Sequence, residues 1–245
     1  MLEAVTLGVS GGELVVIEGS AASGKSTLLE VAAGARPAER GAVWFAGRNT
    51  ATLQKASLPF VRRNIGYYTA AALLLDEDST LANVMSALAV RGEPLAVAEA
   101  GALDALAAVH SQDLAARLVG SLSSGQRRLV ALARALAGPP PLLVADEPAA
   151  LVGDDARVVV VSALARARDL GAAVLAATAD AGWADALVAA GARRIHLAEG
   201  RIVGAPAVGL VPALSLTDAR SARVDSIETE NDDAGVFSPA AKGPR

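Results

Sequence analysis

The chain has 245 residues, of which 53% are hydrophobic, and a formal net charge of −4. A chain of this length and composition can bury the core of one α/β domain without disulfides or metal sites. The absence of cysteine excludes disulfides, zinc–thiolate sites and thiol nucleophiles. The negative charge argues against a nucleic acid partner. No uncharged apolar run reaches about 18 residues, and the start of the sequence lacks the basic region of a signal peptide, so we expect a soluble chain.

A glycine loop follows the first strongly apolar run, at 14–17. Residues 19–26 read G-S-A-A-S-G-K-S and precede a helical stretch that begins near Lys25. Glycines let backbone N–H groups turn toward a phosphate, and the helix N-terminus adds its positive dipole end. Lys25 would reach the β- and γ-phosphates, and the Ser26 hydroxyl would be a ligand for Mg²⁺.

We therefore predict that this loop, which we call the phosphate loop, binds ATP or GTP. A chance glycine-rich turn is the alternative, and the strand before the loop and the helix after it argue against that alternative. The predicted nucleotide-binding residues of the loop are Gly19, Ser20, Ala21, Ala22, Ser23, Gly24, Lys25, Ser26 and Thr27.

The middle of the chain, at about 70–136, carries no comparable strand pattern. Residues 96–109 have alanine and leucine at helical spacing, with Glu99 and Asp104 on the exposed side. We read about 70–136 as an inserted α-helical subdomain.

An acidic pair ends the next apolar run, at 142–145. Asp146 and Glu147 follow it directly, and Pro148 then turns the chain away from the sheet. Ligands of open α/β sheets bind at this carboxyl edge, which argues against two simple surface charges. The pattern predicts that Asp146 holds the Mg²⁺ shell and that Glu147 polarises the attacking water.

The last third of the chain holds another apolar run at 172–177 and a hairpin pattern at 195–203. Together these runs predict an α/β fold with a mainly parallel core sheet. We expect one domain over 1–205 and a disordered, solvated acidic tail over 206–245, in preference to a docking motif. His110 and His196 are read as structural or surface residues.

A third motif lies at 122–126, which reads L-S-S-G-Q and precedes a helical stretch ending near 136. It closely resembles the signature motif of ABC ATPases. The order and spacing of the phosphate loop, the signature and the acidic pair match that family from about residue 2 to 203. The stretches 58–66 and 73–74 are similar to the FtsE, LolD and MacB group. The resemblance implies a P-loop ABC-ATPase domain that binds ATP and Mg²⁺.

The resemblance also implies a head-to-tail dimer, in which the signature of one subunit contacts the nucleotide held by the other. The implied contact residues are Ser123, Ser124, Gly125 and Gln126; Ser123 would equally serve as the N-cap of its helix. The implied partners are an FtsX-like or MacB-like membrane permease and a second nucleotide-binding subunit, as a homodimer or a heterodimer. The implied location is the cytoplasmic face of the cell membrane, and the implied roles are transport and cell division.

Several positions depart from the family pattern. Ala70 stands where the family has a glutamine that contacts Mg²⁺, Ala179 where it has a switch histidine, and Gly153 where it has an aspartate. The aromatic residue that stacks on adenine in the family is missing near the start, and we read Tyr67 and Tyr68 as packing residues rather than substitutes.

These departures predict ATP binding with weak hydrolysis, since a lost proton-transfer or positioning group typically lowers rates by ~10²–10⁴-fold. The alternative is a catalytically inactive chain that completes the active site of a fuller ATPase subunit. An ABC protein of DNA repair would show a long coiled coil or a basic stripe, and neither is present. A small-molecule kinase or a GTPase would share the phosphate loop but would not need the signature motif.

Overall fold

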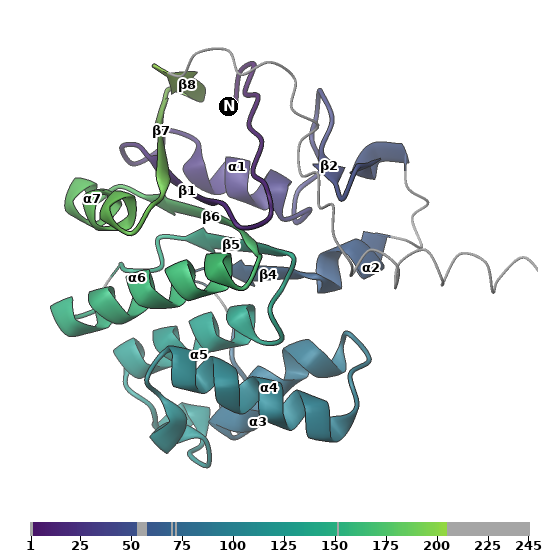
Figure 1. Ribbon diagram of the computed structural model, residues 1–245, viewed down its shortest axis with the longest axis vertical. Helices are drawn as coiled ribbons and strands as arrows, with labels where there is room; N and C mark the ends of the chain where they lie inside the picture. Colours follow the sequence, from purple (N-terminus) through teal and green to yellow (C-terminus); the bar gives the residue numbers. More distant parts are fainter. Residues whose placement is uncertain (1, 53–57, 70, 72, 151, 205–245) are drawn as a thin grey trace, which may run out of the picture.

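The computed structural model describes residues 2–52, 58–69, 71, 73–150 and 152–204. A six-stranded sheet in the order β4-β5-β6-β1-β7-β8 crosses the molecule (Figure 1). Neighbouring strands from β4 to β7 are parallel, and β8 is antiparallel to β7. The predicted α/β fold with a mainly parallel sheet is confirmed. Its strands are β1 (Leu14–Glu18), β4 (Ile65–Tyr68), β5 (Leu142–Asp146), β6 (Ala173–Thr178), β7 (Arg193–Ala198) and β8 (Arg201–Val203).

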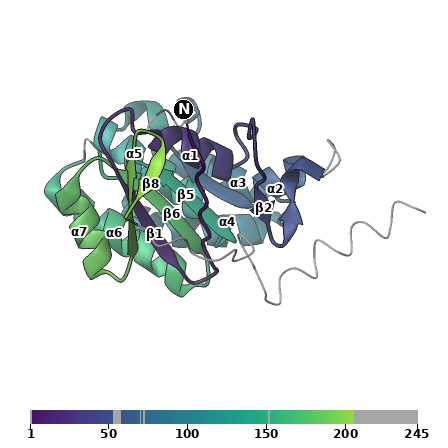
Figure 2. The same cartoon turned by 90° about the horizontal axis from the view of Figure 1, so that it is seen from above.

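Helices cover both faces of this sheet because its central strands are apolar on both sides. In β1, Leu14 and Val16 belong to one buried cluster, and Val15 and Ile17 belong to another. This alternation is the side-chain period of a strand. Helix α1 packs on the second cluster, and α5, α6 and α7 pack on the first (Figures 1 and 2). The two clusters hold the carboxyl ends of β1, β5 and β6 in fixed relative positions.

The helices are α1 (Lys25–Ala32), α2 (Leu58–Arg63), α3 (Thr80–Ala89), α4 (Leu95–Ala108), α5 (Ser124–Leu136), α6 (Asp154–Asp169) and α7 (Ala181–Ala189). Short 3₁₀ turns lie at Thr50–Thr52, Gln112–Leu114 and Val119–Ser121, and β2 (Trp44–Phe45) pairs with β3 (Arg48–Asn49). Helices α3 and α4 lie beyond α5, on the side away from the sheet (Figure 1). The helical subdomain at about 70–136 stays a proposal that is compatible with this arrangement.

Most predicted elements match the structure within one or two residues. The strands at 14–17 and 142–145, the helix at 96–109 and the late hairpin are confirmed, whereas the strand predicted at 172–177 runs from Ala173 to Thr178. Strand β4 and the β2–β3 pair were not predicted. The glycine in β4 disguises it: a Cβ on Gly66 would lie 2.1 Å from the Ala135 carbonyl oxygen, so this glycine permits the close approach of α5. The predicted tail at 206–245 lies outside the described residues.

Candidate active site

The phosphate loop joins the end of β1 to the start of α1, at the carboxyl edge of the sheet. Helix α1 begins at Lys25, and the first N–H groups of a helix have no partner within it. Lys25 is buried, with its side chain 7% exposed, and its Nζ donates to the carbonyl oxygens of Gly19, at 2.8 Å, and Ser20, at 3.0 Å. The lysine thus folds back over the loop, with its ammonium group at the place where a cradled phosphate needs a cation.

Gly19 must be glycine in this packing. A Cβ there would lie 2.3 Å from the Leu197 carbonyl oxygen and 2.6 Å from Ser23 Oγ. Gly24 has a φ of +104°, in the left-handed region that glycine adopts without strain. The two glycines therefore allow the loop to pass close to β7 on its way from β1 to α1.

The acidic pair lies beside the phosphate loop because only one strand, β6, stands between β1 and β5 in the sheet. Strand β1 leads into the loop, and β5 ends in the acidic pair. Glu147 Oε1 is 3.7 Å from Lys25 Nζ. Asp146 Oδ1 is buried and has no hydrogen-bond partner among the described residues. Such an orphaned carboxylate oxygen suits a metal ion, which would satisfy it. The structure thus brings Lys25 and Glu147 together, with Asp146 directly before Glu147 at the end of β5.

Tyr67 lies near this carboxylate group, on β4 next to β5. Burial and the negative charges of Glu30 and Asp146 raise its pKa to about 12. The phenol therefore keeps its proton at neutral pH and adds no negative charge to the site. Tyr68 is buried in the core, which agrees with its predicted packing role.

The turn at Glu147 is conformationally strained. Glu147 has a φ of +49°, which is uncommon for a residue with a side chain and costs of order 1–3 kcal/mol. Its N–H donates to the Ala177 carbonyl oxygen at 3.0 Å, and the Ala150 N–H donates to the Glu147 carbonyl oxygen at 3.0 Å. The turn is thereby attached to the end of β6.

A cavity of about 320 Å³ lies next to this turn. Its lining combines the turn after β5, the start of α6 and the loop after β6: Glu147, Ala149, Ala150, Arg157, Thr178, Ala179 and Asp180. Arg157 Nη2 is 2.7 Å from Asp180 Oδ2, and Asp180 Oδ1 accepts the Trp183 N–H at 3.0 Å. The Trp183 N–H and the Arg157 guanidinium lower the pKa of Asp180, so this carboxylate stays charged at neutral pH.

The signature lies at the N-terminus of α5. Ser123 Oγ accepts the Gln126 N–H at 3.2 Å, and Gln126 Oε1 accepts the Ser123 N–H at 3.0 Å, which forms a capping box. The interpretation of Ser123 as an N-cap is confirmed. A Cβ on Gly125 would meet nothing within 4 Å, so the surface beside it is open.

We expect Ser123→Ala to lower the free energy of unfolding by about 1 kcal/mol, because it removes the acceptor for the first-turn N–H of α5. Denaturant unfolding measures the change. Ser124→Ala is the matched control, since Ser124 is the neighbouring hydroxyl and is not the cap. Equal stability of both variants would contradict a stabilising role for the cap.

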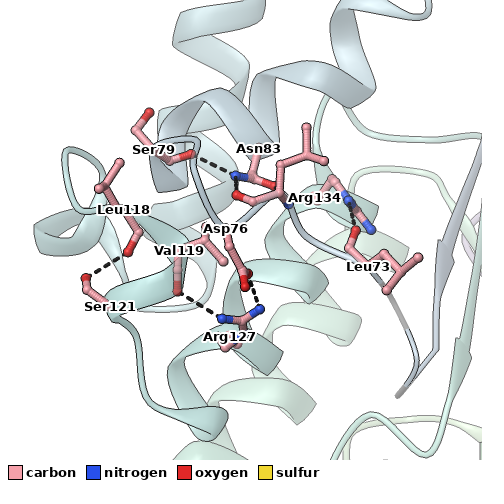
Figure 3. A network of polar contacts seen from close by, with 10 residues as sticks. Leu73, Asp76, Ser79, Asn83, Leu118, Val119, Ser121, Arg127 and Arg134 are labelled. Carbon is pink, nitrogen blue, oxygen red and sulfur yellow. Dashed lines mark hydrogen bonds and ion pairs between the residues drawn. The ribbon is translucent and has the colours of Figure 1, made fainter.

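Polar contacts connect α5 to the segment that precedes α3 (Figure 3). Arg127 contacts the Asp76 carboxylate, and Arg134 Nη1 donates to the Leu73 carbonyl oxygen at 2.6 Å. Asn83 of α3 accepts the Leu75 N–H at 2.8 Å and donates to the Leu75 carbonyl oxygen at 3.0 Å. These contacts hold the backbone of the segment, while the side chains of Leu73 and Leu75 remain 86% and 62% exposed.

Other predicted residues lie apart from the phosphate loop. Among the described residues, no hydrogen bond or ion pair joins the signature to the loop. Gly153 is the N-cap of α6, and Ala70 lies outside the described residues. His110 is exposed; His196, also exposed, has Nδ1 3.6 Å from Glu18 Oε2. This agrees with the prediction that both histidines are structural or surface residues.

A comparison with protein-family models assigns residues 2–150 to the family described as ABC transporter. The chain belongs to the ABC transporter family. It is 40% identical over 149 residues to the lipoprotein-releasing system ATP-binding protein LolD of Chromohalobacter salexigens, covering 60% of this chain and 63% of that protein. It is 32% identical over 169 residues to the cell division ATP-binding protein FtsE of Haemophilus influenzae, covering 69% and 78%. The predicted resemblance to the FtsE and LolD group is confirmed.

Solved structures agree with this assignment. The dimeric structure of the bacterial ABC transporter cassette MJ0796 superimposes with a TM-score of 0.75 and 28% identity, over 82% of this chain and 88% of that one. The structure of the same cassette bound to ADP and Pi, a dimeric post-hydrolysis state, gives a TM-score of 0.74. The predicted ABC-ATPase fold is therefore confirmed.

Arg157 is the site residue that the sequence did not reveal. It lies in a helix rich in arginine and aspartate, and in such a sequence an additional arginine is typical of a solvent-exposed surface. Asp180 directly follows Ala179 and belongs to no motif that the sequence shows. Their pairing across the cavity becomes visible once α6 and the loop after β6 are placed side by side.

Proposed function

We propose that this chain binds Mg-ATP at the phosphate loop and hydrolyses it with Glu147 as the general base. One observation carries the proposal: Lys25 Nζ lies 3.7 Å from Glu147 Oε1, beside the buried, unpartnered Asp146 Oδ1. These are the cation, the base and the metal ligand that phosphoryl transfer to water needs. Ser26, which is exposed in the first turn of α1, would supply a hydroxyl ligand for the metal ion.

The residues present fit a magnesium ion, because Asp146 has a buried carboxylate oxygen without a partner among the described residues; Asp146 and the Ser26 hydroxyl would hold the ion. When bound, Mg²⁺ neutralises charge on the β- and γ-phosphate oxygens. In hydrolysis, a water oxygen bonds to the γ-phosphorus, the bond to the β–γ bridging oxygen breaks with its electron pair leaving on ADP, and Glu147 takes the proton of the water. Lys25 moves from the carbonyl oxygens of its own loop onto the β- and γ-phosphates.

We propose that turnover is weak. The cavity beside Glu147 has Ala179 in its wall, and a methyl group can neither donate a hydrogen bond to the γ-phosphate nor orient the water. The retained Lys25, Asp146 and Glu147 nevertheless favour a hydrolysing chain over a purely inactive partner of another ATPase.

We expect Ala179→His to raise the rate of phosphate release by roughly 10²-fold, since a positioned imidazole typically contributes ~10²–10⁴-fold. The measurement is steady-state phosphate release by the purified chain with Mg-ATP, alongside ATP binding. Ala186→His, on the adjacent helix α7, is the control for adding an imidazole outside this cavity. Fast turnover by the unmodified chain, with no gain from Ala179→His, would contradict impaired hydrolysis.

We further propose that two nucleotide-binding subunits pair head to tail, with Ser123, Ser124, Gly125 and Gln126 facing the nucleotide of the partner. The open surface at Gly125 and the dimeric structures of the similar cassette support this pairing. The membrane partner would be an FtsX-like or MacB-like permease, which would place the chain at the cytoplasmic face of the membrane.

The exposed residues Leu73, which Figure 3 labels, and Leu75 lie on a backbone held by α3 and α5 and would give this permease an apolar contact surface. Among the helices that the structure describes, none meets the length and hydropathy that a bilayer-spanning segment requires. Co-purification with the permease from detergent tests this proposed contact. We expect it to be lost in Leu73→Asp and kept in Leu103→Asp, a change on the exposed side of α4. Equal retention in both variants would place the contact elsewhere.

A further inference from the structure

The strained turn at Glu147 is hydrogen-bonded to the end of β6, and the chain after it leads into α6. The turn continues through Ala149 and Ala150 toward the start of α6, and its N–H group is bonded to Ala177 at the end of β6. Any motion of α6 relative to the loop after β6 would change the distance between the ends of this turn. A contact between these two segments would therefore fix the left-handed conformation of Glu147.

Arg157 and Asp180 make that contact. Arg157 lies in the first turns of α6, where its N–H donates to the Gly153 carbonyl oxygen, and its Nη2 reaches Asp180 Oδ2 at 2.7 Å. Asp180 is itself fixed, because its Oδ1 caps α7 through the Trp183 N–H and its own N–H donates to Thr178 Oγ1 at 3.0 Å. The ion pair thus joins α6 to a rigid point, across the cavity that Glu147 lines.

We propose that Arg157 and Asp180 are positioning residues for the reaction at Glu147. Two contacts carry this proposal: Arg157 joins α6 to Asp180 in the loop after β6, and the Glu147 N–H donates to the Ala177 carbonyl oxygen at the end of the same strand. This inference rests on the proposed role of Glu147 as the general base. It assigns to the pair control over the geometry of the carboxylate rather than contact with ATP.

Both side chains are partly exposed, so the ion pair contributes little to global stability. Its effect should appear in turnover, since a displacement of a catalytic group by about 1 Å can cost ~10²-fold in rate. A pair with a merely structural role would change unfolding and nucleotide binding instead.

The test compares Arg157→Ala and Asp180→Asn with Arg166→Ala. Asparagine at 180 keeps an oxygen that can cap α7 and removes the charge, and Arg166 is an exposed arginine in the last turn of the same helix α6. We expect the first two variants to lower kcat for phosphate release roughly 10- to 100-fold, with KM for ATP changed less than about two-fold. Arg157→Lys should recover part of kcat, and the double variant should lose no more than Arg157→Ala, because both changes break one contact.

Hydrogen exchange supplies a readout that needs no turnover. The amides of Glu147 and Ala150 should exchange faster in Arg157→Ala and Asp180→Asn, and at the unmodified rate in Arg166→Ala. Unchanged kcat and unchanged exchange in Arg157→Ala would overturn the inference, as would an equal loss of ATP binding. If instead the unmodified chain and Glu147→Gln release phosphate equally, the proposed role of Glu147 fails, while faster exchange would still show that the pair holds the turn.

Discussion

Glu147→Gln should release phosphate ~10²–10⁴-fold more slowly than the unmodified chain and should still bind ATP. The amide has the size of the carboxylate but cannot accept the proton of the attacking water, and general bases typically contribute this factor. Binding should persist because Lys25 and the first-turn N–H groups of α1 are untouched. The substitution also removes the negative charge 3.7 Å from Lys25 Nζ, which frees the ammonium group for the phosphates.

Single-turnover phosphate release measures the chemical step, and a fluorescent ATP analogue measures binding. Glu13→Gln is the matched control, because Glu13 precedes β1 at the opposite edge of the sheet, where it pairs with Arg193. Equal rates in Glu147→Gln and the unmodified chain would mean that another group activates the water. A parallel loss of ATP binding would assign Glu147 to nucleotide binding rather than to proton transfer.

The sequence predicts the strands and motifs of this site because each depends on local chemistry. The phosphate loop is recognised from Gly19, Gly24 and Lys25, because this spacing is typical of a loop that binds phosphates. The acidic pair is recognised from its place at the end of an apolar run. The late hairpin is equally local. The predicted helix at 96–109 and the predicted central strands are confirmed, because their apolar residues recur at the period of the side chains that the structure buries.

Features that depend on distant parts of the chain are missed. Strand β4 is hard to recognise because it contains Gly66, and the Ala135 carbonyl oxygen that excludes a side chain there lies far along the chain. The role of Arg157 has no signal in the local sequence, because its partner Asp180 belongs to the loop after β6. The left-handed φ of Glu147 has no local signal either, since glutamate rarely adopts it. In each case, packing between elements decides what the residue does.

Gly19→Ala should weaken ATP binding by roughly 10- to 100-fold and lower the free energy of unfolding by about 1–3 kcal/mol, the usual cost of overpacking. The added Cβ would lie 2.3 Å from the Leu197 carbonyl oxygen and 2.6 Å from Ser23 Oγ, so the loop or β7 must move. Displaced N–H groups lose charge-assisted hydrogen bonds to phosphate, each worth about 1.5–3 kcal/mol. Isothermal titration with Mg-ATP and denaturant unfolding measure the two effects.

Gly125→Ala separates this packing effect from the general effect of adding a methyl group to a nucleotide motif. Nothing lies within 4 Å of its added Cβ, and alanine suits the first turn of α5 better than glycine does. The isolated chain should therefore keep its stability and its ATP affinity, and any loss should appear only in ATP-dependent pairing of two subunits. If Gly19→Ala binds ATP as well as Gly125→Ala does, the loop tolerates the displacement, and its N–H groups contribute less to phosphate binding than the Lys25 ammonium group.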